Sequence, residues 1–435
     1  MMNEELAGVW AFLAALLLTL FGVPVSISML SVGVIGFGLM NGWDMAGYIM
    51  GSAPFEAVFP YGLSVVPLFV AMGVFAANAG LSRSLFDAVN LVVGRYRGGL
   101  AIAAIGACAI FGAICGSSLA TAATMGRIAV PEMLRAGYAK SISAATVAAA
   151  GTLGVLIPPS VLLVIYALLT ETSIGKLFAA ALIPGLIATL LYIAAVVISI
   201  RINPSLVQLP SNEDAPDKKK VLRGVLPVLG LFIVVIGGLY AGFFSPTEAA
   251  AVGAIGAFLL AVAMSKGAKR WQNLISASLE TARTSAMIFM ILIGAAMFNF
   301  LLEGTGLTTL LGGWVTSAGL PAWGVMGIIL IFYVILGCFM DALSMILLTI
   351  PVVFPIVSAL GYDPIWFGIV IVSVAEIGLI TPPIGMNLFV IQGVAPEVKQ
   401  KDIIKGILPF IVADIFRIAI LVLVPGLVLF LPSLM

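Results

Sequence analysis

The polar residues best suited to bind a cation lie at four interruptions of otherwise apolar segments. The first two interruptions carry Ser117, Ser118 and Thr121 beside Gly116, and Gly151, Thr152 and Gly154. The last two carry Asp341 and Ser344, and Gly378, Thr381 and Asn387. Unwound backbone offers carbonyl oxygens, and hydroxyl, amide and carboxylate oxygens complete the shell of a hard cation. The sequence therefore predicts two related ion sites with a substrate site between them.

Two acidic residues among these apolar segments need an explanation of their own. An aspartate at mid-membrane costs about 2.5–3.5 kcal/mol on insertion scales, so Asp341 needs a cation or a donor to offset that cost. Glu376 has three interpretations, as an ion ligand, a proton carrier, or an acceptor for backbone N–H groups freed at the break; the last is favoured. Serines in membrane helices also serve close packing. Ser117 and Ser118 are therefore candidate cation ligands only because they lie together at a break.

The remaining charges within apolar segments have simpler interpretations. Asp414 and Arg417 lie three residues apart on one predicted helix, as do Glu280 and Arg283, and we expect each pair to interact. Arg127 lies six residues past the first polar cluster. Its side chain either extends to the cytoplasmic surface or faces the cavity and holds a carboxylate.

The interruptions recur at one fixed spacing along the chain. Pro131, Gly137, Tyr138, Gly154, Pro158 and Pro159 correspond to Pro355, Gly361, Tyr362, Gly378, Pro382 and Pro383. Proline lacks the N–H and clashes with the preceding turn, so each proline pair breaks a helix. Matched broken helices in two halves of a membrane protein are typical of secondary transporters, whose site lies at the breaks.

Composition indicates a membrane protein. Apolar residues make up 62% and charged residues 9% of the chain, and the mean hydropathy is +1.23, whereas a soluble domain carries about 25% charged residues. Histidine is absent, and the three cysteines lie in apolar segments. We therefore expect no cofactor, no disulfide and no transition-metal site. The opening MMNEEL lacks a basic leader, so we expect a retained helix over 6–22 instead of a cleaved signal peptide.

Two apolar stretches are too long for one straight span. Segments 97–134 and 322–360 would each extend about 57 Å as a helix, but the hydrocarbon core is only about 30 Å thick. We expect both to fold back as re-entrant hairpins with tips near Gly116 and Asp341. Segments 141–170 and 365–394 are also over-long, and we expect them to be helices broken at the proline pairs.

The predicted fold is an all-α polytopic membrane protein of two inverted-topology repeats, with about ten transmembrane helices, two re-entrant hairpins and two broken helices. The first repeat, 1–200, contains scaffold 6–79, hairpin 97–134, broken helix 141–170 and closing helix 177–200. A cytoplasmic linker, 201–223, joins it to the second repeat, 224–435, with scaffold 224–302, hairpin 322–360, broken helix 365–394 and closing helix 406–432.

The distribution of charge supports this topology. With a periplasmic N-terminus, the predicted cytoplasmic stretches hold all but two of the 20 Lys and Arg residues, the exceptions being Lys176 and Arg417. The outer loops carry mainly acids, among them Glu56 and Glu303. Cytoplasmic loops of membrane proteins are enriched in Lys and Arg. In the opposite orientation most Lys and Arg residues would lie in the outer loops, contrary to that rule.

Four motifs then point to a known family. The segments GAICGSSLATAATMGRIAVPEMLRAGY, GTLGVLIPPS, FFSPTEAAAVGAIGAF and AEIGLITPPIGMNLFVIQGVA resemble, in this order, the large membrane subunit of TRAP transporters, the tripartite ATP-independent periplasmic carriers. The resemblance covers nearly the whole chain. It implies a sodium-coupled elevator carrier for organic acids such as C4-dicarboxylates or sialic acid, in the bacterial inner membrane, with Na⁺ as coupling ion and no other cofactor.

The resemblance also implies partners and site positions. The partners are a small four-helix membrane subunit, here expected as a separate polypeptide, a periplasmic substrate-binding protein, and the lipid bilayer, with no nucleic acid. The family's hairpin-tip positions fall on Ser117 and Ser118. Its broken-helix positions fall on Gly154, Pro158, Pro159, Thr381, Pro382 and Pro383. We expect the prolines, with Thr121, Arg127 and Asn387, on the substrate side of the site, and the remaining polar and glycine positions around Na⁺.

Three alternative functions remain to be weighed. A divalent-anion/sodium symporter that works without a binding protein has a similar architecture, and co-purification with a small helical subunit would separate the two. A membrane-embedded enzyme is disfavoured because the chain has no histidine and no matched pair of acids. A passive channel is disfavoured because inverted hairpins suit alternating access. A GxxxxGK[ST] phosphate loop is missing, so we expect no ATP hydrolysis by this chain.

Overall fold

The computed structural model describes residues 4–207, 218–264, 270–307, 310–311, 313, 319 and 321–435. These residues form helices, turns and bends and no strand, which confirms the all-α prediction. Part of the predicted linker 201–223, including Pro210 and Pro216, lies outside the described residues.

Seven helices of the described chain are long and apolar enough to cross a membrane, or eight if one bent pair counts as a single span. This is fewer than the ten predicted, because several predicted spans form shorter apolar helices. Segments 6–22 and 24–40 become helices of 17 residues each. Segment 365–394 divides into helices of 17 and 9 residues.

The first half of the chain contains eleven α-helices among its described residues. They are α1 (Glu4–Leu20), α2 (Val25–Asn41), α3 (Trp43–Val58), α4 (Val65–Asn78), α5 (Leu81–Val93), α6 (Gly99–Cys115), α7 (Ser118–Arg135), α8 (Lys140–Gly151), α9 (Leu153–Leu156), α10 (Val161–Leu169) and α11 (Ile174–Ile202). The predicted hairpin 97–134 corresponds to α6 and α7, which pack against each other.

The described part of the second half continues the helical series. Its helices are α12 (Lys218–Phe232), α13 (Gly238–Tyr240), α14 (Pro246–Met264), α15 (Arg270–Thr305), α17 (Ala322–Gly337), α18 (Ala342–Ala359), α19 (Pro364–Ile380), α20 (Met386–Val394), α21 (Gln400–Leu423) and α22 (Gly426–Leu429). A π-helical turn, Ile233–Gly237, joins α12 to α13.

Helix boundaries repeat at the same spacing as the sequence pattern. Helices α7 and α18 each have 18 residues and begin at equivalent positions, Ser118 and Ala342. Helices α8 and α19 likewise begin at Lys140 and Pro364, and the helical segments end at Leu156 and Ile380. The two halves differ at one point, where Thr152 separates α8 from α9 while α19 is continuous.

Side-chain caps explain where several of these helices begin. The carboxylate of Asp363 accepts hydrogen bonds from the N–H groups of Ile365 and Trp366, and Pro364 occupies the first turn of α19. Ser160 caps α10 and Ser173 caps α11 in the same way. Such caps satisfy backbone donors that a helix leaves unpaired at its N-terminus.

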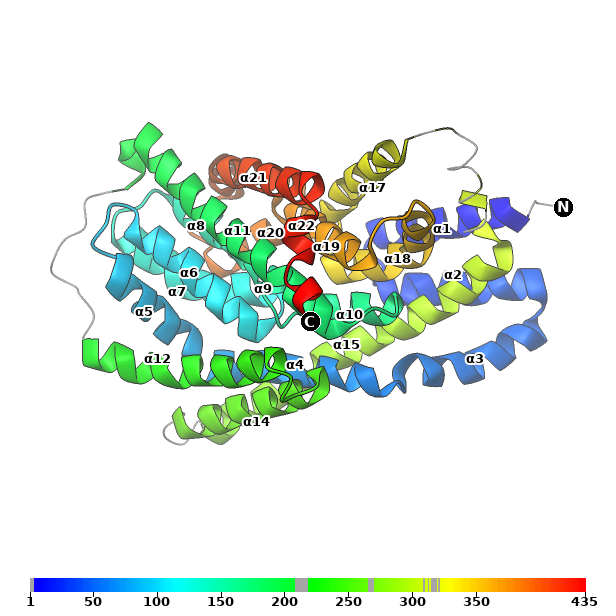
Figure 1. Cartoon of the computed structure of the whole chain (residues 1–435), viewed down its shortest axis with the longest axis horizontal. Coiled ribbons are helices and arrows are strands. Elements are labelled where there is room, and N and C mark those ends of the chain that lie inside the picture. The colour runs from blue at the N-terminus through cyan, green and yellow to red at the C-terminus, as the bar shows by residue number, and fades with distance from the viewer. Residues whose placement is uncertain are drawn as a thin grey trace.

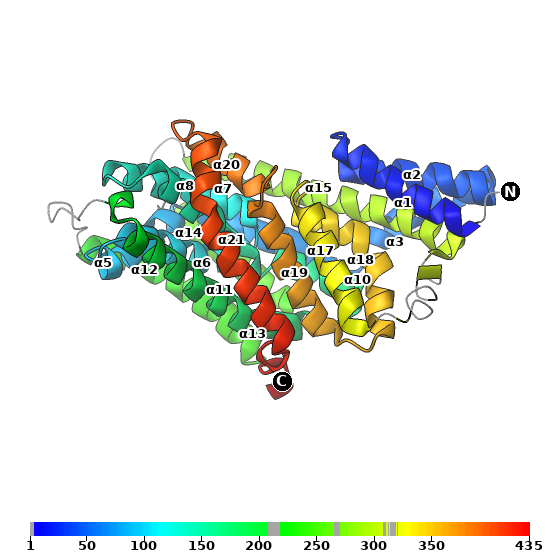
Figure 2. The same cartoon turned by 90° about the horizontal axis from the view of Figure 1, so that it is seen from above.

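The helices form an elongated molecule with most of the hairpin and broken helices inside and α17 at its edge (Figure 1). Figure 1 shows α12, α14, α4 and α3 along one long side and α21 and α17 along the opposite side, with α6 to α10 and α18 to α20 between them. Helix α15 packs along α2 and α4, and α14 packs along α4. Figure 2 shows α21 crossing the molecule beside α11, while α1 and α2 lie at the end that carries the N-terminus.

Candidate functional site

The first hairpin turns through a glycine and a serine cap. Gly116 has φ +64°, a left-handed conformation that glycine adopts without the steric cost of a side chain. Ser117 is extended, and its hydroxyl accepts a hydrogen bond from the N–H of Ala120 at 3.4 Å, which begins α7. Ser118, the first residue of α7, is buried. The predicted tip therefore lies where the sequence pattern placed it.

The second hairpin turns with an aspartate in the equivalent place. Asp341 caps α18, because one carboxylate oxygen accepts the N–H of Ser344 at 3.0 Å and the other accepts the hydroxyl of Ser344 at 2.5 Å. Ser117 and Asp341 thus hold the same capping position in the two halves of the chain. Ser344 supplies hydrogen-bond donors to the carboxylate of Asp341. Helix capping is therefore one reason for an aspartate at this position.

Close backbone contacts join each hairpin to its neighbouring break. A Cβ on Gly112 of α6 would overlap the Cα of Gly154, and a Cβ on Gly378 would overlap the Cα of Gly337 in α17. A Cβ on Gly151 would meet that of Ala122 at 2.7 Å. Only glycine permits backbones to approach so closely in membrane bundles. Gly151, Gly154 and Gly378 therefore serve packing in both halves.

A cavity of about 180 Å³ lies where the two hairpin tips meet the outer helices. Its wall includes three of the residues predicted as ligands, Ser117, Ser118 and Asp341. Helix α4 contributes Val70 and Val74 to the wall, and α15 contributes Glu280, Thr284, Met287 and Ile288. The acids of the wall are Glu280, Asp341 and Glu376, and none of the described residues of the wall is Lys or Arg. The wall is therefore mostly apolar, with the oxygen atoms of three acids and three hydroxyl groups set into it.

Glu376 and Ser118 join the second half of the chain to the first. The hydroxyl of Ser118 donates to Oε2 of Glu376 at 2.5 Å, and both side chains are buried. Among the described residues, Oε1 of Glu376 has no hydrogen-bond partner. The interpretation of Glu376 as an acceptor for backbone N–H groups is therefore wrong. Its partner is a side chain at the opposite hairpin tip.

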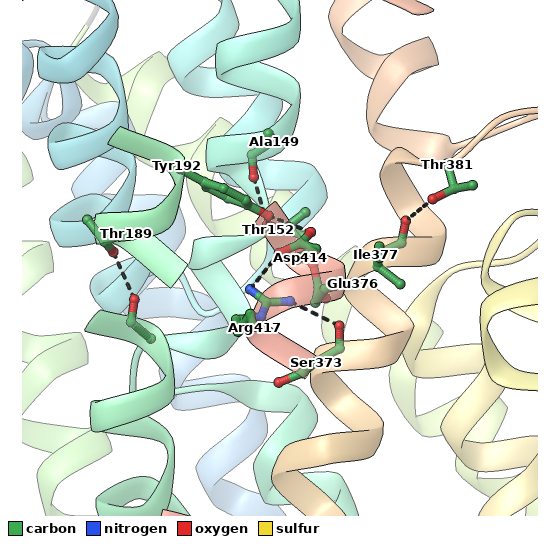
Figure 3. Close-up of polar contacts among 12 residues, drawn as sticks. Ala149, Thr152, Thr189, Tyr192, Ser373, Glu376, Ile377, Thr381, Asp414 and Arg417 are labelled. Carbon is green, nitrogen blue, oxygen red and sulfur yellow. Dashed lines mark hydrogen bonds and ion pairs between the residues drawn. The ribbon is translucent and has the colours of Figure 1, made fainter. Parts of the chain in front are cut away.

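A second polar network connects helices of the bundle (Figure 3). Asp414 and Arg417 form an ion pair at 3.1 Å, which confirms their predicted pairing, and both side chains are at most 1% exposed. The hydroxyl of Tyr192 donates to Asp414 at 2.8 Å and lies 3.0 Å from that of Thr152. Arg417 also donates to the carbonyl of Ser373 at 3.1 Å. The network therefore connects α8–α9, α11, α19 and α21.

The other predicted residues lie outside the cavity wall. Asn387 is buried and donates to the carbonyl of Ala148 at 3.0 Å, which ties α20 to α8. The hydroxyl of Thr381 donates to the carbonyl of Ile377 at 2.6 Å. Thr121 is buried beside Gly154. A Cβ added to Gly154 would lie 2.5 Å from Oγ1 of Thr121. Arg127 is exposed on α7.

The proline pairs form the unwound segments themselves. Pro158 and Pro159 are buried between α9 and α10, whereas Pro383 is exposed between α19 and α20. The peptide bond between the two prolines is cis in each pair. None of the four prolines contributes to the cavity wall, and their assignment to the substrate stays a prediction.

Sequence reasoning left two acids of the cavity out of the site. Glu280 was expected to pair with Arg283, but among the described residues no ion pair joins them, and Glu280 lines the cavity. For Glu376 the sequence favours a role as acceptor of backbone N–H groups, which the structure contradicts. The signal that points to Glu376 is its position in the repeat, because it is the counterpart of Thr152 and so corresponds to an interruption of the first half.

Comparison with known proteins places this geometry in a family. Residues 12–427 match the family model described as the tripartite ATP-independent periplasmic transporter, DctM component. The chain is 38% identical over 381 residues to the C4-dicarboxylate TRAP transporter large permease protein DctM of Pseudomonas aeruginosa, covering 87% of this chain and 88% of that one. It is 31% identical over 417 residues to the sialic acid TRAP transporter large permease protein SiaM of Vibrio cholerae, covering 95% of each.

A solved structure has a similar fold. The YdaH transporter of Alcanivorax borkumensis superposes with a TM-score of 0.66 and 17% sequence identity, covering 98% of each chain. At that identity the similarity concerns the fold alone. The membrane-protein architecture thus agrees with the apolar helices, and the family assignment comes from the sequence relatives.

Proposed function

Because the chain belongs to the DctM component family of tripartite ATP-independent periplasmic transporters, we propose that it is the transport subunit for sodium-coupled uptake of a small organic acid. The substrate is a C4-dicarboxylate, sialic acid or a similar carboxylate. The membrane is the bacterial inner membrane, with the N-terminus on the periplasmic side. The chain acts as a secondary transporter and not as an enzyme.

The single observation that supports this proposal best is the meeting of both hairpin tips at one cavity. Ser117, Ser118 and Asp341 lie in its wall together with Glu376 and Glu280. Hydroxyl and carboxylate oxygens are the ligands that a hard monovalent cation accepts. A wall that contains three acids and no described basic residue needs cations before it can hold an anionic substrate. Bound sodium would therefore neutralise the negative charge of these acids as the substrate carboxylate enters.

We propose two related sodium sites, one in each half. The first includes Ser117, Ser118, Gly151, Thr152 and Gly154, and the second includes Asp341, Ser344, Gly378 and Thr381. The substrate lies between them, near Thr121, Asn387 and the proline pairs, with Arg127 as a contact for its carboxylate at the cytoplasmic side. Thr152 acts in this scheme through its hydrogen bond to Tyr192, since its hydroxyl is already engaged there.

We also propose that the two halves are inverted repeats that work as an elevator. The repeated helix boundaries and the paired glycine contacts support the repeat. Helices α6 to α10 and α17 to α20 carry nearly all the proposed ligands, so they form the moving body. Helices α1 to α4 and α12 to α15 form the scaffold, whose apolar outer face docks the small four-helix subunit.

Reconstituted protein tests the function directly. Proteoliposomes with the chain and its small subunit receive an inward sodium gradient, candidate binding proteins and radiolabelled carboxylates. We expect accumulation that requires both sodium and a binding protein. Accumulation with sodium but without any binding protein would favour the divalent-anion/sodium symporter type. Accumulation that ignores the sodium gradient would reject sodium coupling.

A further inference from the structure

The hydroxyl groups of the buried network around Tyr192 have one consistent donor order (Figure 3). Arg417 carries only donors, and its ion pair with Asp414 at 3.1 Å leaves that carboxylate an acceptor. Tyr192 gives its one proton to Asp414 at 2.8 Å. The contact of 3.0 Å between the hydroxyl oxygens of Tyr192 and Thr152 therefore needs the proton of Thr152.

This donor order fixes the hydroxyl of Thr152 at the first break. Its proton also faces the carbonyl oxygen of Ala149 at 2.6 Å, so Thr152 shares the proton between two acceptors. Shared hydrogen bonds of this kind are common where a helix ends. Thr152 is the residue that separates α8 from α9, and its side chain is completely buried. The network therefore holds the backbone at the point where the helix is interrupted.

The same network holds the equivalent carbonyl of the second half. Arg417 donates to the carbonyl oxygen of Ser373 in α19 at 3.1 Å. Ser373 is the repeat counterpart of Ala149, at the spacing that relates Pro355 to Pro131. The network thus contacts both broken segments at matching turns. Hydrogen bonds to charged groups are stronger than neutral ones, above all in a buried site, so the network gives both segments firm support.

The break that Thr152 holds faces the tip of the first hairpin. A Cβ on Gly154, two residues later, would lie 2.9 Å from the carbonyl oxygen of Ser117 and 2.5 Å from Oγ1 of Thr121. Thr121 is fully buried, and its Oγ1 has no hydrogen-bond partner among the described residues. A buried hydroxyl without a partner is costly, so this place needs a further ligand. These are the tip and the break of the first proposed sodium site.

We propose that Tyr192 is a positioning residue for this cation site, with Asp414 and Arg417 as its support. None of the three lines the cavity between the tips, so they act through Thr152 and through α19 and not by contact with the ion. By fixing Thr152, the network fixes the distance between the broken backbone and the oxygen atoms of the tip. The proposal rests on the proposed function for the existence of the cation site.

Removing one hydroxyl tests this role. Tyr192→Phe keeps the aromatic ring, which packs edge-on against Phe410 with ring centroids 5.6 Å apart, and deletes the link to Thr152. Binding of radiolabelled Na⁺ to the purified protein is measured in lipid–detergent micelles without substrate. We expect the sodium affinity to fall about fivefold, or about 1 kcal/mol. Tyr240→Phe is the matched control, because that hydroxyl bonds the carbonyl of Phe178 in the same helix, α11, and we expect no change.

A double-mutant cycle separates positioning from general packing. Thr152→Val removes the hydroxyl at the break and leaves a side chain of similar size. If Tyr192 acts through Thr152, Tyr192→Phe should weaken sodium binding no further in the Thr152→Val background. Equal losses from Tyr192→Phe in both backgrounds would show that the hydroxyl of Tyr192 affects the whole bundle and not the break, which would overturn the proposal.

A second variant keeps the proposal testable if Tyr192→Phe does not fold. The double change Arg417→Met with Asp414→Asn removes both charges and leaves an amide beside Tyr192. An amide can donate as well as accept, so the donor order of Tyr192 and Thr152 is no longer fixed. We expect folded protein whose sodium affinity is about fivefold lower than that of the wild type. Folded protein with the sodium affinity of the wild type would contradict the proposal.

The outcomes distinguish this proposal from the proposed function. Lithium and potassium are tested beside sodium. Sodium binding that neither variant weakens would overturn the positioning role and leave sodium coupling intact. If the wild type binds lithium or potassium in place of sodium, and Tyr192→Phe weakens that binding, the positioning role stands and sodium coupling is rejected. If none of the three ions binds, both are rejected.

Discussion

Ser117 and Asp341 cap the returning arms of the two hairpins with one geometry, at equivalent positions of the two halves. Each side chain accepts the backbone N–H of the residue three positions later, in α7 and in α18. A neutral hydroxyl is a sufficient cap for α7, so the charge of Asp341 is not needed to begin α18. The carboxylate also lies in the cavity wall, where a cation can use that charge.

Replacing Asp341 separates its charge from its cap. Asp341→Asn and Asp341→Ser both keep a capping oxygen and remove the charge. We expect both to raise the sodium concentration for half-maximal uptake at least tenfold, about 1.4 kcal/mol, with a much smaller change in substrate affinity at saturating sodium. Sodium-titrated uptake in proteoliposomes measures this. An unchanged sodium dependence in both variants would leave Asp341 as a helix cap only.

The sequence was sufficient to place the turns at the predicted tips and the breaks at the proline pairs because their signals are local. A glycine and a serine at a tip, like a proline pair at a break, change the backbone close to them in the chain. The constant spacing of the repeat then identifies the equivalent tip and break in the other half. The tips at Gly116 and Asp341 and the ion pair between Asp414 and Arg417 are local features of this kind.

Contacts between different helices could not be predicted in the same way. Ser118 and Glu376 are 258 residues apart, and Thr152 and Tyr192 belong to helices whose relative rotation depends on the whole bundle. The three-residue spacing within one helix predicts that Glu280 pairs with Arg283, but the side chain of Glu280 lines the cavity. The described helices that are long and apolar enough to cross a membrane are also fewer than the ten predicted spans, because hydropathy does not show that α1 and α2 end after 17 residues each.

The glycine contact between hairpin and break is expected to be intolerant of a single methyl group. In Gly154→Ala the new Cβ would lie 2.5 Å from Oγ1 of Thr121 and 2.9 Å from the carbonyl oxygen of Ser117. Overpacking of this kind costs about 1–3 kcal/mol. Gly327→Ala in α17 is the control, because nothing lies within 4 Å of its Cβ. The melting temperature in detergent should fall for Gly154→Ala and not for the control; equal melting temperatures would contradict the packing.

The buried ion pair makes a second stability prediction. Arg417→Met leaves Asp414 charged and buried with only Tyr192 as a donor, and removing one partner of a buried pair costs about 3–5 kcal/mol. Adding Asp414→Asn removes the stranded charge and should recover most of the loss. Arg83→Ala is the control, because the pair of Arg83 with Glu132 is solvent-exposed and worth at most about 1 kcal/mol.

Equilibrium unfolding in mixed micelles measures these four proteins. We expect Arg417→Met to be the least stable and the double variant to lie close to the wild type. If the double variant is as unstable as Arg417→Met, the loss comes from the contact of Arg417 with the carbonyl of Ser373 and the packing around it, and not from the charge of Asp414.

Cross-linking between a scaffold helix and the first hairpin tests the elevator. Val74 of α4 and Cys115 at the end of α6 line the same cavity, and the backbone of Cys115 would lie 2.8 Å from a Cβ on Gly73, the residue before Val74. A short bifunctional thiol reagent should therefore join Val74→Cys to Cys115 when Cys108 and Cys338 are replaced by serine. If α6 must move against α4 during each cycle, this cross-link should abolish uptake. Docking of the binding protein should persist.

The matched control keeps Val74→Cys and replaces Cys115 by serine, so the reagent modifies one thiol without joining the helices. We expect this control to retain uptake after treatment, and a reducible cross-linker to restore uptake in the cross-linked protein once reductant is added. Mass spectrometry gives the fraction cross-linked. Full uptake by fully cross-linked protein would show that α6 does not move relative to α4, and the division into a moving body and a scaffold would have to be redrawn.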